Sequence, residues 1–334
     1  PEQILTVAQD GKAKYTSIQK AMEAAKPGQV VHVLDRGPYR ELLIQTPADD
    51  IALVSTVGTR IEVPSWYRWG PDGALKDKSI YQGFIVAGPR GFRISGFDII
   101  CPVVPRDTSH AMAMEFAVSG ELIIENCRII HTPRYGRDWT PGDVEEHFFS
   151  LRLTSNDPSG GQQIVRDNYL EGAIDFIRGT DHTVVAERNH IVAPRNFLGI
   201  NLVAPRFAKV WIRHNVIHSN NGIFLGPQEP KTEANARVVI ANNIFDVKNA
   251  PAWGWSTPPR QVQFVNNVIH SRHGHGFVGF RDSYPAVKDG WEFRHNCYRH
   301  ELTKVEVPKD QHMFRLAAAD IVEQAPFLSD DRTD

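Results

Sequence analysis

Short apolar segments recur along the chain, and in each one apolar and polar residues alternate before a polar pair and a second apolar piece. The segments are FRISGFDII (92–100), LIIENCRII (122–130), IVRDNYL (164–170), VVAERNHIV (184–192), VWIRHNVIH (210–218), VVIANNIFD (238–246), VQFVNNVIH (262–270) and WEFRHNCYR (291–299). Alternation with a period of two is typical of β-strands. The pattern therefore predicts an all-β protein built from repeated short strands.

Alignment of these repeats on the polar pair brings a column of mostly asparagine to one position. The column is Phe97, Cys127, Asn168, Asn189, Asn215, Asn243, Asn267 and Asn296, at spacings of 30, 41, 21, 26, 28, 24 and 29 residues. Irregular repeats of this length indicate a solenoid. Because stacked strands lie about 4.8 Å apart, asparagine amides can hydrogen-bond along the stack, and the column is predicted to be a structural ladder.

We predict a single-stranded right-handed parallel β-helix of about ten coils, in one domain spanning residues 1–334. Residues 1–30 are expected to form an N-terminal cap, 31–300 the coils and 301–334 a C-terminal cap. Within YTSIQKAMEAAKPG, Thr16 and Gln19 are expected to form the capping box of a helix that Pro27-Gly28 ends. The capping helix would cover the exposed strand edges at that end.

Composition narrows the classes of function. The 334 residues are 41% hydrophobic and carry a formal net charge of −2, so nothing in the overall charge favours nucleic acid. No apolar stretch approaches the roughly 20 residues that span a bilayer. Cys101, Cys127 and Cys297 are widely spaced and are expected to be buried apolar residues rather than a disulfide or zinc framework. A monomer is expected, and no metal or cofactor site is evident.

The strands that follow the ladder position carry the candidate chemistry. In MEF, LRL, IDF and INL the flanking apolar residues are predicted to point inward, because side chains alternate along a strand. The middle residues would then form one outward column of Glu115, Arg152, Asp175 and Asn201, continued by Phe224, Trp253 and Val278. Asp175 is thus expected to face outward, with no need to be buried.

Three interpretations of this column are open. A salt-bridge ladder would stabilise the coils by roughly 0.2–1 kcal/mol per cross-strand pair. A site for acid–base chemistry would use Glu115 and Asp175, whose backbones lie about 9–10 Å apart across two coils. That separation is near the upper end of the spacing between the carboxyl groups of inverting glycosidases. Sugar binding without turnover is a third interpretation.

Further candidate residues lie beside the column. The insertion HTPRYGRDWTPGDVEEHFF (131–149) supplies Arg137 and Trp139, and NAPAWGWSTPP (249–259) supplies Trp253 and Trp255. Aromatic rings stack on sugars and arginines pair with carboxylates. The candidate substrate-binding residues are Asn201, Arg178, Trp139, Arg137, Trp253 and Trp255.

Several segments resemble pectin methylesterases, a family of the pectin-lyase-like right-handed β-helix superfamily. The likeness covers roughly residues 4–245 and includes the opening ILTVAQDGKAKYTSIQKAMEAAKPGQ with GPYRELLIQ, the coils GFRISGFDII and AMAMEFAVSGELIIENCRII, and GAIDFIRG. GAIDFIRG is similar to the family motif GTVDFIFG, and FLGPQEP to LGRPW. The resemblance implies a β-helix that acts on pectin-type polysaccharides, and it favours a location outside the cytoplasm.

The same resemblance implies roles for individual residues. Asp175 matches the family's nucleophilic aspartate, whereas Arg152 stands where the family has its acid/base aspartate. Leu151 and Met112 replace two glutamines, and Pro227 replaces the arginine of LGRPW. Arginine serves as the base in related β-helix lyases, which implies such a role for Arg152, and calcium is expected if the protein is a lyase.

The leading hypothesis is a hydrolase or lyase that acts on an acidic glycan, with Asp175, Arg152 and Glu115 as the catalytic residues. The alternative is a non-catalytic carbohydrate-binding or scaffold domain of a larger bacterial protein, such as one attached to a Ser/Thr kinase. That alternative rests on the likeness of the entry segment to β-helix modules of such proteins. A carbohydrate esterase is the third hypothesis, since only one of five functional positions of that family is kept.

Overall fold

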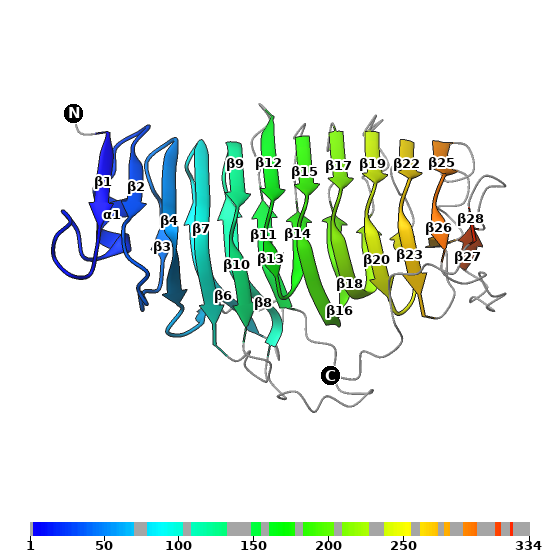
Figure 1. The fold of residues 1–334 in the computed structure, drawn as a ribbon, viewed down its shortest axis with the longest axis horizontal. Helices are drawn as coiled ribbons and strands as arrows, with labels where there is room; N and C mark the ends of the chain where they lie inside the picture. Colours follow the sequence, from blue (N-terminus) through cyan, green and yellow to red (C-terminus); the bar gives the residue numbers. More distant parts are fainter. Residues whose placement is uncertain are drawn as a thin grey trace.

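The computed structural model shows a long parallel β-solenoid, with the N-terminal strand at one end and the last coils at the other (Figure 1). It describes residues 3–69, 79–102, 108–131, 148–154, 160–177, 183–203, 209–226, 237–254, 261–272, 277–280, 290–298, 311–314 and 321–322. The coils contribute strands to three faces, here called face 1, face 2 and face 3. The predicted parallel β-helix architecture is confirmed.

Face 1 is a continuous series of ten parallel pairings from the first strand to the last coil. Its strands are β1 (Ile4–Val7), β2 (Val30–Val33), β4 (Ile51–Glu62), β7 (Gly91–Cys101), β9 (Gly120–Glu125), β12 (Gly161–Arg166), β15 (Thr183–Glu187), β17 (Lys209–Arg213), β19 (Arg237–Ala241), β22 (Gln261–Val265) and β25 (Trp291–Arg294). The long strands β4 and β7 continue into face 2.

Faces 2 and 3 follow in each coil. Face 2 holds the ends of β4 and β7, then β10 (Arg128–His131), β13 (Tyr169–Leu170), the first parts of β16 (His190–Val203) and β18 (Val216–Leu225), β20 (Ile244–Val247), β23 (Val268–Ser271), β26 (Cys297–Tyr298) and β28 (Ile321–Val322). Face 3 holds β3 (Ile44–Gln45), β6 (Ser79–Ala87), β8 (Thr108–Ala117), β11 (Phe148–Thr154), β14 (Ala173–Ile177), the ends of β16 and β18, β21 (Ala252–Gly254) and β24 (Phe277–Phe280). Two strand pairings are antiparallel. In one, β5 (Tyr67–Trp69) pairs with β6, and in the other, β27 (Gln311–Phe314) pairs with β24.

The corner between faces 1 and 2 repeats the same geometry from coil to coil. The residue before each ladder position has a positive φ of 52° to 83°: Gly96, Asn126, Asp167, Arg188, His214, Asn242, Asn266 and His295. Asparagine, aspartate and glycine adopt this left-handed conformation most readily. At Gly96 the coils also approach closely, because a Cβ there would overlap the carbonyl oxygen of Ser55.

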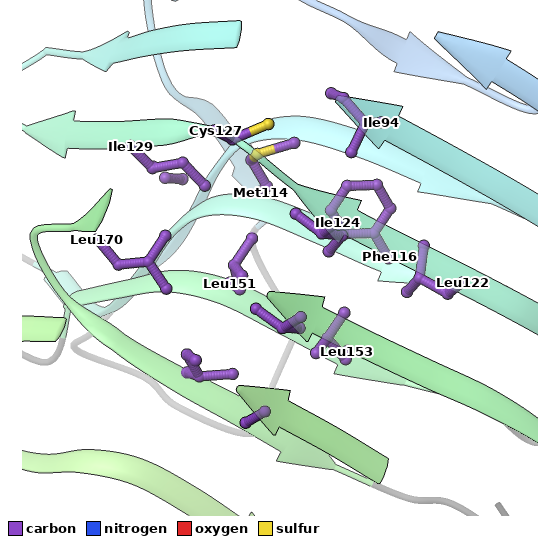
Figure 2. Packing of buried hydrophobic residues seen from close by; sticks show 14 of the residues in the cluster. Ile94, Met114, Phe116, Leu122, Ile124, Cys127, Ile129, Leu151, Leu153 and Leu170 are labelled. Carbon is purple, nitrogen blue, oxygen red and sulfur yellow. The ribbon is translucent and has the colours of Figure 1, made fainter. Parts of the chain in front are cut away.

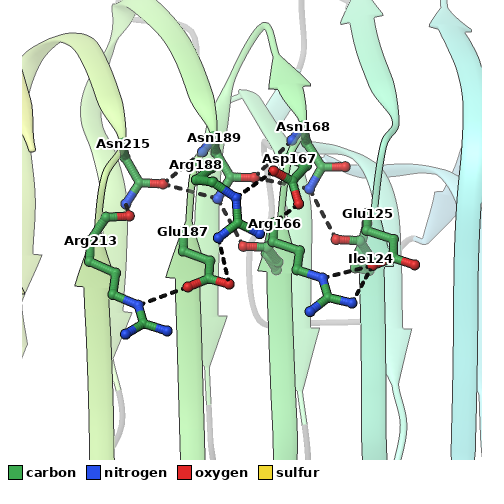
Figure 3. A network of polar contacts seen from close by, with 11 residues as sticks. Ile124, Glu125, Arg166, Asp167, Asn168, Glu187, Arg188, Asn189, Arg213 and Asn215 are labelled. Carbon is green, nitrogen blue, oxygen red and sulfur yellow. Dashed lines mark hydrogen bonds and ion pairs between the residues drawn. The ribbon is translucent and has the colours of Figure 1, made fainter.

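The asparagine ladder is confirmed along this corner. From Asn189 onward, each ladder Oδ1 accepts hydrogen bonds from the backbone N–H and the side-chain Nδ2 of the ladder asparagine one coil earlier, at 3.0 to 3.2 Å between Asn168 and Asn189. Asn168 Oδ1 accepts from Cys127 N–H at 2.9 Å. The pattern continues through Asn215, Asn243, Asn267 and Asn296. Figure 3 shows the ladder from Asn168 to Asn215, with ion pairs such as Asp167–Arg188 beside it. Phe97 and Cys127 occupy the same register and are buried.

The solenoid interior is filled by the inward apolar side chains of all three faces. Figure 2 shows this packing around Phe116, Ile124 and Leu151, which are fully buried. Cys101 and Cys127 are buried as predicted, whereas Cys297 lies only partly buried on an outward position of face 2. A buried core on the inner side leaves the outward positions of each face to carry polar chemistry.

The N-terminal helix α1 (Ile18–Ala24) covers one end of the solenoid, as predicted, but its cap differs. Ser17 rather than Thr16 is the N-cap residue, and its side chain accepts from Lys20 N–H. The Glu41 carboxylate accepts from the N–H groups of Ile18 and Gln19. The predicted capping box is therefore wrong, because Glu41 from a later coil accepts from the Gln19 N–H that Thr16 was expected to serve.

Candidate functional site

The predicted outward column is present in register on face 3. Arg152 of β11 pairs with Glu115 of β8 on one side and with Asp175 of β14 on the other, and Asp175 pairs with Asn201 of β16. The column continues through Phe224 of β18 and Trp253 of β21 to Val278 of β24. The flanking apolar residues Ile174 and Phe176 are buried in the core. Strand alternation therefore brings residues from seven coils to one line.

Asp175 is the centre of the polar part of this column. Its Oδ2 accepts from Arg152 Nε at 2.9 Å, and its Oδ1 accepts from Asn201 Nδ2 at 2.9 Å. The residue is fully buried, with a relative exposure of 0%. The prediction that Asp175 need not be buried is wrong, because alternation sets the direction of a side chain but not what covers it.

Burial changes the proton affinity of Asp175. Loss of water raises the pKa of this carboxyl to about 6, although the Arg152 charge and the two hydrogen bonds favour the ionised form. The nearby Glu115 charge raises the pKa further. Asp175 is therefore a carboxyl that exchanges its proton at mildly acidic pH, which is the range in which general acids and bases are most effective.

Arg152 and Glu115 do not form the alternating ladder that charge order alone suggests. The Arg152 side chain is 14% exposed and pairs with Asp175, and its guanidinium lies 5.4 Å from the centroid of the Phe149 ring. Glu115 is half-buried and accepts a short hydrogen bond from Gln82 Nε2 of β6. Sequence reasoning missed Gln82 because the strand SIYQGFIV was not aligned with the repeats.

Asn201, predicted as a substrate-binding residue, is half-buried and holds Asp175 through its Nδ2. Its Oδ1 is buried without a hydrogen-bond partner in the part of the chain that the structure describes. An unpartnered buried acceptor costs free energy. Asn201 Oδ1 could therefore accept from a hydroxyl group of a ligand.

An aromatic pair continues the column beyond Asn201. The rings of Phe224 and Trp253 have centroids 5.2 Å apart and are tilted by 48°. Phe224 is buried, whereas Trp253 is half-buried. Aromatic rings with apolar faces stack on the C–H faces of sugars, so the column runs from charged groups to an aromatic end.

Four of the predicted binding residues, Arg137, Trp139, Arg178 and Trp255, lie outside the described residues. The structure thus brings together Glu115, Arg152, Asp175, Asn201 and Trp253 from the predicted set.

In the part of the chain that the structure describes, no group of three or more His, Cys, Asp or Glu residues is placed to hold a metal ion. No helix in the described ranges is long and apolar enough to cross a membrane. The expectation of calcium for a lyase stays a prediction.

Comparisons with known proteins give no family for the chain: no family model matches it, and no curated protein is similar to it in sequence. Inference about function therefore rests on the geometry of face 3.

Proposed function

We propose that this protein acts on an acidic polysaccharide, as a hydrolase or a lyase, at Glu115, Arg152 and Asp175. One observation carries the proposal: a buried carboxyl with a pKa of about 6 lies in register between an arginine and an amide on an outward face. Strongly shifted carboxyl pKa values are concentrated at functional sites. The parallel β-solenoid is compatible with a polysaccharide-active protein, and membership of the pectin-lyase-like superfamily belongs to the same proposal.

Each residue has a distinct role in this proposal. Protonated Asp175 supplies a proton to the departing glycosidic oxygen, and Glu115, two strands away, accepts a proton from water or from the sugar. Arg152 orients Asp175 and offers positive charge to a uronate carboxylate. Arg152 and Asn201 each donate a hydrogen bond to one Asp175 oxygen. One of these two hydrogen bonds must break when substrate binds, so that Asp175 can contact the substrate.

A non-catalytic glycan-binding or scaffold domain is the second candidate. It is favoured by the same two hydrogen bonds, which leave Asp175 fully buried and already satisfied. In that case Trp253 and Asn201 would bind sugar while Asp175 keeps the strands together. Esterase chemistry has less support, because Arg152 replaces the acid/base aspartate that the resemblance would require.

An activity screen separates these candidates. Pectin, polygalacturonate, alginate and a neutral glycan are incubated with the protein, with calcium or with chelator, and reducing ends, unsaturated product and methanol are followed. Reducing ends without unsaturated product mean hydrolysis, and unsaturated product means a lyase. We expect wild-type turnover to fall as pH rises above about 6, because Asp175 then loses its proton.

The key variant is Asp175→Asn, which keeps the size of the side chain and removes the proton exchange. Asp167→Asn is the matched control, since Asp167 also pairs with an arginine but on an exposed corner. Turnover that survives in Asp175→Asn would disprove the catalytic role. Glycan binding without turnover in the wild type would support the binding domain instead.

A further inference from the structure

A second cluster of titratable side chains lies on the outer side of face 2. His218 of β18, Asp246 of β20 and His270 of β23 are cross-strand partners on three adjacent strands. His218 Nδ1 lies 2.7 Å from Asp246 Oδ2, and His270 Nδ1 lies 3.0 Å from Asp246 Oδ1. One carboxylate is thus held between two imidazoles, away from the column on face 3.

The groups around the cluster are mainly cationic or apolar. The Arg272 guanidinium lies 3.6 Å from Asp246 Oδ2, and Lys248, two residues after Asp246, is exposed. On the neighbouring strand β16, Val192 lies opposite His218, and His190 lies opposite Val216. Val216 and Ile244 are 36% and 39% exposed in the adjoining row. The outer side of face 2 therefore combines positive charge with accessible apolar surface.

Protonation increases the positive charge of this surface. An ionised Asp246 only accepts hydrogen bonds, so each neutral histidine must donate Nδ1–H to it. Burial opposes ionisation of Asp246, yet its hydrogen bond with His218 and the surrounding charges hold its pKa at about 2. When the histidines take up protons, both ring nitrogens of each carry hydrogen and the cluster gains positive charge.

The charge of the cluster follows from its members. With neutral histidines, the carboxylate of Asp246 and the cations of Lys248 and Arg272 give the cluster a net charge of +1, and with both histidines protonated its charge is +3. Lys248 and Arg272 directly follow β20 and β23, so the charge is local, and the whole chain has a formal net charge of −2. A small cationic patch beside exposed aliphatic side chains fits a sugar polymer with acidic groups better than a nucleic-acid duplex, which is bound by an extended basic surface.

We propose that His218, Asp246 and His270, together with Lys248 and Arg272, form a binding site for an anionic polysaccharide that strengthens as the pH becomes acidic. The site lies on face 2 and does not depend on the chemistry proposed for Asp175. It gives the protein a second contact for an acidic glycan chain.

Binding of dextran sulfate tests the proposal, because the sulfate groups stay ionised at all the pH values used. Titrations at low salt at about pH 5.5 and about pH 7.5 are compared for wild type, His218→Gln/His270→Gln and a His32→Gln control on face 1. We expect binding by the wild type and the control to tighten by about tenfold or more at the lower pH. The double variant should bind at both pH values as the wild type does at pH 7.5.

Several results would overturn the site. They are an unchanged wild-type affinity between the two pH values, a double variant that keeps the tightening, or equal binding of neutral dextran. Tighter binding of duplex DNA than of dextran sulfate would overturn the assignment to a glycan. Should the double variant fold poorly, His218→Gln alone replaces it, since its amide can still donate to Asp246, and NMR of the histidine Hε1 protons must show shifts of His218 and His270 when dextran sulfate is added. Normal dextran sulfate binding with loss of turnover in Asp175→Asn would show that the two sites are independent.

Discussion

Two stacks of polar residues run along the solenoid in register: the corner between faces 1 and 2, and the column on face 3. They differ in how completely the polar side chains are hydrogen-bonded. In the corner, successive asparagines make the same contacts, as at Asn189, where the side-chain Oδ1 accepts and the Nδ2 donates hydrogen bonds (Figure 3). In the column, Asp175 is a buried acid of raised pKa and Asn201 Oδ1 has no partner among the described residues. A repeated stack in which every polar group has a hydrogen-bond partner indicates a structural role. A stack that keeps a buried acid of raised pKa and an unpartnered acceptor indicates a functional role.

The largest effect is expected from breaking the ladder. Asn215→Ala would remove the acceptor of Asn189 N–H and Nδ2 and the donor to Ala186 O. Because each orphaned buried group costs about 1–3 kcal/mol, we expect the free energy of unfolding in urea to fall by about 4 kcal/mol. Asn242→Gly, one residue before the next ladder position and already at positive φ, should change it by less than about 1 kcal/mol. Equal losses in both variants would contradict the role of the ladder.

The next effect concerns the ion pair of the column. Arg152→Ala leaves the Asp175 carboxylate buried without its cation, which should cost about 3 kcal/mol of unfolding free energy at neutral pH. The cost should shrink at about pH 5, because Asp175 becomes neutral when it takes up a proton. Arg213→Ala is the control: Arg213 is 48% exposed, and its partner Glu187 also pairs with Arg188. A loss of the same size in Arg213→Ala would show that burial is not the cause.

A smaller effect is expected in the pH dependence of stability. The pKa of Asp175 is raised from 3.8 to about 6 in the folded protein, so the folded state binds the proton more tightly than the unfolded state. The resulting stabilisation is complete below about pH 4 and is lost as pH rises through about 6. The unfolding free energy of wild type minus that of Asp175→Asn should therefore fall by about 2–3 kcal/mol between about pH 4 and pH 7. A constant difference would mean that the Asp175 pKa is not raised.

The smallest effect is expected at the exposed corner. Asp167 accepts hydrogen bonds from Arg188 Nε and Nη2, but the side chains are 34% and 48% exposed. Asp167→Asn should lower the unfolding free energy by less than about 1 kcal/mol at neutral pH, because water screens exposed pairs. A loss comparable to that of Arg152→Ala would remove the distinction between the two regions.

The aligned repeats predicted the ladder and the register of the column correctly, because strand period and coil stacking are local properties that the sequence carries. The same alignment places His218, Asp246 and His270 three residues after their ladder asparagines. The face 2 cluster could therefore be predicted from the aligned repeats. The contact between Gln82 and Glu115 could not be predicted in this way, because β6, the strand that carries Gln82, lies outside the aligned repeats.

The sequence by itself determined an all-β solenoid, the positions of its corner asparagines and the line of residues from Glu115 to Val278. Only the tertiary structure decided that Asp175 is buried, that Arg152 pairs with it rather than with Glu115, and that Glu41 caps the helix. Alternation along a strand fixes direction and register, because both follow from backbone geometry. Burial, pairing and proton affinity follow from what neighbouring coils place around each side chain.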